Sequence, residues 1–60
     1  LEVGARLRII RVPYFGSFGV VTELPHEPVV VPSGARVRVL RAKLEGGDEV
    51  IVPRANVELV

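Results

Sequence analysis

The sequence predicts one small all-β domain built from five short strands. Apolar and polar residues alternate with a period of two, which is the spacing of a strand with one buried face, and five prolines interrupt the chain too often for an ordinary helix. The 60 residues suffice for a single domain over residues 1–60, and 48% of them are hydrophobic, so a core of valine, isoleucine and leucine is available. The chain has no cysteine, so no disulfide adds to the stability of that core.

The first half of the chain predicts two strands joined by a tight loop. The first strand covers Arg6–Val12, and the adjacent pair Ile9-Ile10 breaks its alternation, which predicts a bulge or a strong bend at that point. The loop Pro13–Ser17 follows, and the second strand covers about Phe18–Leu24.

The next segment is rich in proline, which has no N–H group to donate and therefore suits a central strand poorly. Two interpretations of Pro25–Gly34 stay open: a long ordered loop, or a short edge strand over Val29–Val31. An exposed edge strand would allow two copies of the chain to pair, so the oligomeric state is open as well.

The rest of the chain predicts a hairpin, a helical turn and a closing strand. The longest strand covers Ala35–Leu44, and the turn Glu45–Asp48 joins it to a strand over Glu49–Val52. A 3₁₀ turn at Arg54–Asn56 precedes the last strand, Val57–Val60. Five short strands, one long loop and one 3₁₀ turn are typical of a small SH3-like barrel.

Basic residues fall in two stretches of the chain, although the formal net charge is only +1. Neither stretch contains an acidic residue. The basic residues in them are Arg6, Arg8, Arg11, Arg36, Arg38, Arg41 and Lys43. If the strands that carry them are neighbours, the first two arginines of each stretch form a stripe that can neutralise phosphates. The alternative is an ordinary solvent-facing set, paired in part with glutamates across strands.

The segment Gly4–Val21 has the most distinctive pattern in the chain. A hydrophobic strand leads into Pro13-Tyr14-Phe15-Gly16, and Gly19 and a valine pair follow. This pattern resembles the KOW motif of ribosomal proteins and NusG-type transcription elongation factors. The resemblance implies a KOW-type SH3-like barrel that docks on RNA or on a ribonucleoprotein or transcription machine through the loop after the first strand.

Two residues depart from the KOW pattern. Val12 stands where the family has the first glycine of the loop, and Phe15 stands where the family often has a lysine. The resemblance therefore implies one backbone-phosphate contact fewer in this chain.

The aromatic pair at the loop tip is the best candidate for a direct contact. If Tyr14 or Phe15 is exposed next to Arg11, its ring can stack on a base. The alternative is that one ring closes the end of the barrel. The third aromatic residue, Phe18, is expected in the core.

The residue types of catalytic and metal sites are absent from the chain or isolated in it. His26 stands alone between prolines, and no carboxylate pair, Ser-His-Asp set or phosphate-binding glycine loop is present. We therefore expect a non-catalytic binding module without cofactor or metal. The alternative to nucleic-acid docking is a protein-interaction or structural module of a larger protein. Binding of proline-rich peptides is less favoured, because it needs an aromatic-lined groove.

The ends and the hydropathy of the chain lead to expectations about its setting. The chain begins at Leu1 and contains no methionine, so we expect a domain cut from a longer protein, whose other domains are then candidate partners. No apolar run approaches the roughly 18 residues of a membrane span, and no signal-peptide pattern is present. We expect a cytoplasmic protein that has no membrane partner.

Overall fold

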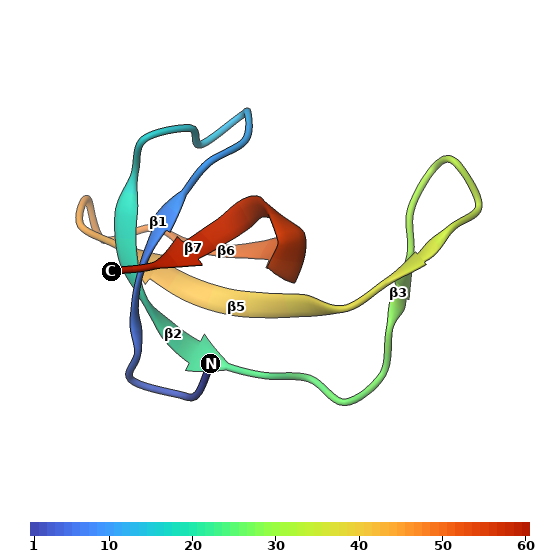
Figure 1. The fold of residues 1–60 in the computed structure, drawn as a ribbon, viewed down its shortest axis with the longest axis horizontal. Helices are drawn as coiled ribbons and strands as arrows, with labels where there is room; N and C mark the ends of the chain where they lie inside the picture. The colour runs from blue at the N-terminus through green and yellow to red at the C-terminus, as the bar shows by residue number, and fades with distance from the viewer.

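The computed structural model describes all 60 residues and is all-β, as the sequence predicts. It contains a five-stranded sheet, a separate two-stranded sheet and one 3₁₀ turn (Figure 1). The elements are β1 (Arg6–Ile9), β2 (Phe18–Glu23), β3 (Val29–Val30), β4 (Arg36–Val37), β5 (Val39–Leu44), β6 (Glu49–Pro53), the 3₁₀ turn η1 (Arg54–Asn56) and β7 (Val57–Leu59).

The main sheet is antiparallel, with the strand order β6-β5-β2-β1-β7. Consecutive hairpins join β1 to β2 and β5 to β6, and the last strand returns to pair with the first. The outer sides of β6 and β7 have no partner strand, so the sheet is open and no closed barrel is formed. The five-stranded arrangement is confirmed, and the SH3-like barrel stays a prediction.

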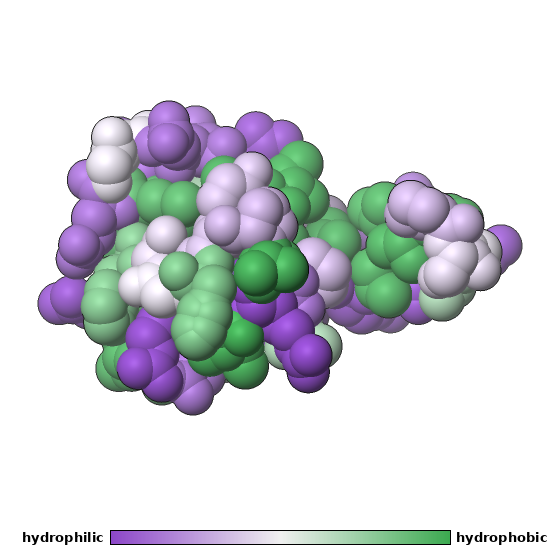
Figure 2. Space-filling view, turned by 90° about the horizontal axis from the view of Figure 1, so that it is seen from above, coloured by the Kyte–Doolittle hydropathy of each residue, from purple (hydrophilic) through white to green (hydrophobic).

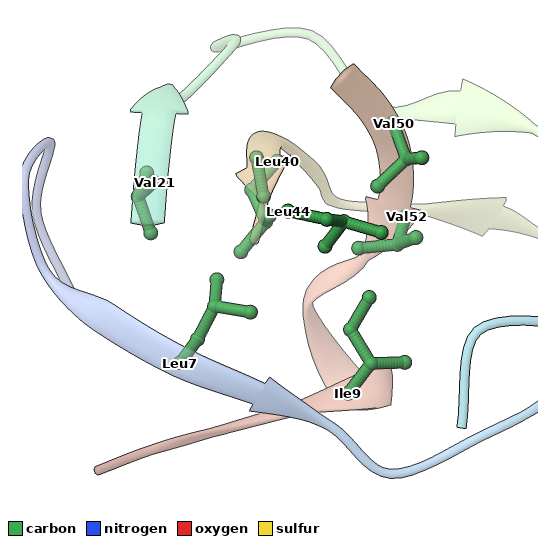
Figure 3. Close-up of a cluster of buried hydrophobic side chains, with 8 residues drawn as sticks. Leu7, Ile9, Val21, Leu40, Leu44, Val50 and Val52 are labelled. Carbon is green, nitrogen blue, oxygen red and sulfur yellow. The ribbon is translucent and has the colours of Figure 1, made fainter. Parts of the chain in front are cut away.

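The core lies on the concave side of this sheet. Alternation buries every second residue of β1, β2, β5 and β6, and Figure 3 shows these side chains pointing toward one another. The cluster consists of Leu7, Ile9, Val21, Leu40, Ala42, Leu44, Val50 and Val52. Only 10 of the 60 residues are buried, so each of these side chains accounts for a large share of the hydrophobic stabilisation.

The first strand is shorter than predicted. It ends at Ile9, and the N–H of Ile10 donates to the carbonyl oxygen of Asn56 at 2.8 Å, outside the β1–β2 ladder. The break in alternation at this point therefore marks the end of the strand: of the two predicted alternatives the bend is observed, at Arg11, and no bulge interrupts the pairing of β1 with β2. Because the strand ends here, Arg11 and Val12 belong to the loop that leads to β2.

The predicted long strand Ala35–Leu44 is interrupted at Arg38. Its first part, β4, leaves the main sheet and pairs with β3, with Val29 opposite Val37 and Val30 opposite Arg36. The proline-rich segment therefore forms a strand rather than a loop, in a hairpin of its own. We call residues 25–38 the arm; it projects from the main sheet in Figure 1.

The remaining elements lie within one or two residues of their predicted bounds. The turn after β5 is closed by the N–H of Leu44, which donates to the carbonyl oxygen of Asp48 at 2.8 Å, and Gly47 adopts φ +97° there. The predicted 3₁₀ turn is present between β6 and β7.

Arg54 ties both ends of the arm to the main sheet. Its Nε donates to the carbonyl oxygen of Val39 at 3.1 Å, and its Nη2 donates to the carbonyl oxygen of Pro25 at 3.3 Å. Its backbone N–H donates to the carbonyl oxygen of Arg38 at 2.9 Å. Within the arm, the guanidinium of Arg38 donates to the carbonyl oxygen of His26. These bonds hold the base of the arm without a hydrophobic core.

Candidate functional site

The register of the main sheet places two cations on either side of an exposed valine. Arg6 on β1 lies opposite Val20 on β2, and Val20 lies opposite Lys43 on β5. All three are exposed, because their neighbours along each strand are the residues that are buried. This row crosses the outer face of the sheet, on the side away from the core.

A hollow of about 440 Å³ opens on this outer face beside Val20. Its walls are mainly apolar, and its charged residues are two cations and one carboxylate. The lining residues are Arg6, Phe18, Gly19, Val20, Thr22, Lys43, Leu44 and Glu45. Arg6 and Lys43 outnumber Glu45, so the hollow attracts an anionic group while offering apolar surface to the rest of a ligand.

Gly19 allows β2 and β5 to approach closely beneath the hollow. A Cβ atom at this position would lie 2.7 Å from the carbonyl oxygen of Lys43 and 3.0 Å from Cδ2 of Leu44. Because backbone atoms at that distance cannot move cheaply, any larger residue would push the two strands apart. The spacing between the side chains of β2 and β5 therefore depends on this glycine.

A second hollow, of about 300 Å³, lies between the loop after β1 and the turn after β5. It shares Phe18, Leu44 and Glu45 with the first, so the two hollows adjoin. Its charged lining residues are Glu45 and Asp48, and no cation lines it. Phosphates are therefore favoured in the first hollow and disfavoured in the second.

The loop residues singled out by the sequence are exposed. Tyr14 is 38% exposed, Phe15 is 64% exposed, and Arg11 is exposed beside them. Neither ring is buried, so the alternative in which one ring closes the end of the barrel is not observed. Tyr14 and Phe18 both line the second hollow.

Phe18 lies on the surface rather than in the predicted core. It is 37% exposed, because Gly19 and Val21 occupy the inward positions of β2 and Phe18 therefore points outward. The same alternation brings Val20 and Thr22 to the outer face. This part of the site was missed in the sequence because Phe18 was assigned to the core as an aromatic residue. The alternation along the strand already puts Phe18 and Val21 on opposite faces of the sheet.

The condition for a stripe that joins the first two arginines of each basic stretch is not met, because the strands that carry them are not neighbours. Arg36 and Arg38 lie in and at the base of the arm, so they are not neighbours of β1. Arg38 donates to a carbonyl oxygen of the arm, as described above. The reason is the interruption of the long strand at Arg38, which separates the second basic stretch into two parts.

The other predicted cations differ in solvent exposure and in whether they form an ion pair. Arg8 forms an ion pair with Glu58 across β1 and β7, as the alternative interpretation expected for part of this set. Arg41 is half-buried between Glu23 and Ile51 on the neighbouring strands, and its Nε has no hydrogen-bond partner. Arg6, Arg11 and Lys43 are exposed and form no ion pair, and the same holds for Arg36 on the arm, so these four are the cations most available to a partner. Glu49 on β6 lies opposite Lys43.

The structure contains no group of three or more His, Asp and Glu side chains that could hold a metal ion. No helix in it is long and apolar enough to cross a membrane. No protein-family model matches the chain, and neither a curated protein nor a solved structure matches it significantly. The case for a function therefore depends on the geometry and charge of the outer face.

Proposed function

We propose that this chain is a non-catalytic docking module that binds RNA or a ribonucleoprotein surface. Its contact surface combines the outer face of β1, β2 and β5 with the loop after β1. The observation that supports this best is the row Arg6–Val20–Lys43 beside the hollow at Phe18, since it joins unpaired cations to an exposed aromatic ring.

The loop after β1 supplies the second part of the proposed surface. Arg11, Tyr14 and Phe15 are exposed there, and the resemblance to the KOW motif implies contacts from this loop. Phe18 connects the two parts, because it lines both hollows and directly follows the loop. A nucleic-acid strand could therefore contact the loop and the sheet face together.

The order of strands supports the KOW-type SH3-like barrel as the underlying fold. In such a barrel a meander of four strands is closed by a fifth strand that lies beside the first, and here β7 pairs with β1. The strong curvature visible in Figure 1 brings β6 and β7 to the same side of the core, joined by η1.

A second candidate function, as a protein-interaction module, is favoured by the arm. Val29 and Val30 are exposed, and Figure 2 shows the arm as a separate lobe with hydrophobic residues on its surface. Exposed apolar side chains on a projecting element are typical of protein contact sites. The two functions use different surfaces, so a single set of variants can distinguish them.

The test is a titration of single- and double-stranded RNA into the ¹⁵N-labelled protein at low and at physiological salt. We expect amide shifts at Arg6, Lys43 and the loop, and none on the arm. With three phosphate contacts, the plot of log K against log salt concentration should have a slope of about −2, since each contact on a single strand contributes about 0.7.

Two charge reversals give a matched comparison. Lys43→Glu should weaken binding and reduce the magnitude of the salt slope by about 0.7, the contribution of one contact on a single strand. Arg36→Glu makes the same change of charge on an exposed strand residue of the arm and should leave binding unchanged. If both variants weaken binding equally, the effect is one of net charge and the proposed surface is wrong.

A further inference from the structure

We infer that the hollow on the outer face holds one unstacked nucleotide, so that the module selects single-stranded over duplex RNA. This inference rests on the proposed function and names its ligand more closely. The shape, the aromatic residue and the charges of the hollow each support it.

The size of the hollow suits a small planar group and not a duplex. Its volume of about 440 Å³ lies in the range of small-molecule sites, which is about 300–1,000 Å³. It lies over Gly19, whose missing side chain keeps the strands close, between the outward side chains of Phe18 and Val20. The bases of a duplex are stacked and paired, so only a strand with a free base can fill it.

Phe18 offers the aromatic face on which a base can stack. It lines the hollow, is 37% exposed and follows the loop directly, so its ring is accessible from solvent. Val20 and Leu44 add apolar surface around it. Stacking on an aromatic ring contributes similar binding energy for each of the four bases, so the site should have only a weak sequence preference.

The charges around the hollow indicate where the phosphates of the bound strand should lie. Arg6 and Lys43 approach the hollow from β1 and β5, so they can contact the phosphates on either side of the stacked base. The adjoining hollow has only Glu45 and Asp48 as charged lining residues. The phosphates should therefore lie over Arg6 and Lys43 and not in the adjoining hollow.

The carboxylate of Glu45 offers a test by gain of affinity. It is the only acidic residue that lines the first hollow, and it opposes the two cations there. Glu45→Gln keeps the shape of the side chain and removes the charge, so it should strengthen binding of a single strand. Glu27→Gln, at an exposed position of the arm that lines neither hollow, is the matched control and should have a smaller effect; Glu49 is unsuitable because it lies opposite Lys43 on β6.

The experiment compares an eight-nucleotide oligouridylate with an RNA duplex of the same length, on the wild type and on three variants. Phe18→Leu keeps an apolar side chain and removes the aromatic face, and it should weaken oligouridylate binding about 5- to 150-fold. Phe18→Tyr keeps the ring and should bind like the wild type. Ile51→Ala changes an exposed apolar residue outside both hollows and should have no effect.

Ring-current shifts supply a readout that a general loss of stability would not give. Stacking of uracil on Phe18 should move the H5 and H6 protons of the uracil upfield, because the ring current of Phe18 shields them. Thermal unfolding of each variant shows whether it is folded at the temperature of the titration, and Phe18→Tyr tests the site even if Phe18→Leu is unstable.

The outcomes separate this inference from the proposed function. If the oligonucleotide shifts Arg11, Tyr14 and Phe15 but Phe18→Leu binds it like the wild type, the hollow is not the nucleotide site and the docking function stands. Equal affinity for duplex and single strand would overturn the inference in the same way. If no RNA causes shifts at low salt, or if only a proline-rich peptide shifts the hollow, both proposals fail.

Discussion

The main sheet and the arm are built from similar residues but reach opposite degrees of burial. Val21, Val50 and Val52 of the main sheet are at most 8% exposed, whereas Val29 and Val30 of the arm are 46% and 62% exposed. The main sheet has five strands that curve around one core, and the arm has two strands that cannot cover either of their own faces. Alternation along a strand decides which valines face inward, as Val20 and Val21 show, and the number of strands around that inward face decides whether they are buried.

The arm nevertheless has two distinct faces. Since Val29 lies opposite Val37 and side chains alternate, Val29, Val31, Ala35 and Val37 share one face, and this face is entirely apolar. The opposite face has Val30 beside Arg36. The arm is thus amphipathic like a strand of the main sheet, and polar bonds from Arg54 attach it in place of a core.

The largest expected difference between the two regions is in the cost of truncating a side chain. Leu40→Ala removes a fully buried side chain and should cost about 2–5 kcal/mol of unfolding free energy. Val30→Ala in the arm should change it by no more than about 0.5 kcal/mol. Urea denaturation followed by circular dichroism measures both values. A comparable loss for Val30→Ala would mean that the arm is part of the cooperative core.

Two glycines give the next comparison, within the main sheet and its turn. Gly19→Ala places a Cβ atom 2.7 Å from the carbonyl oxygen of Lys43 and should cost about 1–3 kcal/mol. At Gly46 a Cβ atom would meet nothing within 4 Å, so Gly46→Ala should be close to neutral. Thermal unfolding of the two variants tests this. Equal stability would show that β2 and β5 can separate at little cost, and the hollow would then not have a fixed width.

The strands of the main sheet could be predicted well because each has a buried face. The alternation around Leu7, Val21 and Val50 follows the period of two, and glycine marks the turn after β5. The interruption at Arg38 could not be predicted in this way. Residues 35–44 have the pattern of one continuous strand, and only the tertiary contacts of Arg38 and Arg54 show that the chain leaves one sheet for another.

Only part of the candidate site could be predicted, because only part of it depends on local sequence. The loop cations and aromatic residues are local features, and Arg11, Tyr14 and Phe15 are exposed at the loop as expected. The pairing of Arg6 with Lys43 across Val20 depends on the register of three strands that are distant in sequence. No local pattern contains that register, so the sequence could not show which of its cations lie side by side.

Arg54 is the residue whose loss should affect the arm more than the sheet. Arg54→Met keeps the aliphatic part of the side chain and removes the bonds to Val39 and Pro25, so it should cost about 1 kcal/mol of global stability. We expect faster hydrogen exchange at the N–H of Val31, which donates to the carbonyl oxygen of Ala35 within the arm.

The matched control is Arg36→Met, which removes an exposed arginine from the arm itself and leaves the Arg54 bonds intact. Its exchange rate at Val31 should equal that of the wild type. If Arg54→Met leaves exchange in the arm unchanged, the hairpin bonds alone hold the arm, and its attachment to the main sheet does not stabilise it.

The smallest expected effect concerns the free edge of β3, where the chain could pair with a second copy. The N–H of Val31 donates toward β4, so the N–H of Val30 points to the free edge, as would those at positions 28 and 32. Both of these positions are proline, so the edge keeps a single donor. Proline on an edge strand is a known obstacle to strand pairing between molecules, and we therefore expect a monomer.

Restoring the donors should weaken this obstacle. The double variant Pro28→Thr, Pro32→Thr gives the edge two further N–H groups beside exposed valines, and it should show weak, concentration-dependent association in sedimentation equilibrium where the wild type shows none. Substitution of Val30 by Lys in that double variant should reverse the association, because a charge would then lie at the centre of the paired edge. Association of the wild type itself would mean that one donor suffices, and the arm would then be a pairing strand despite its prolines.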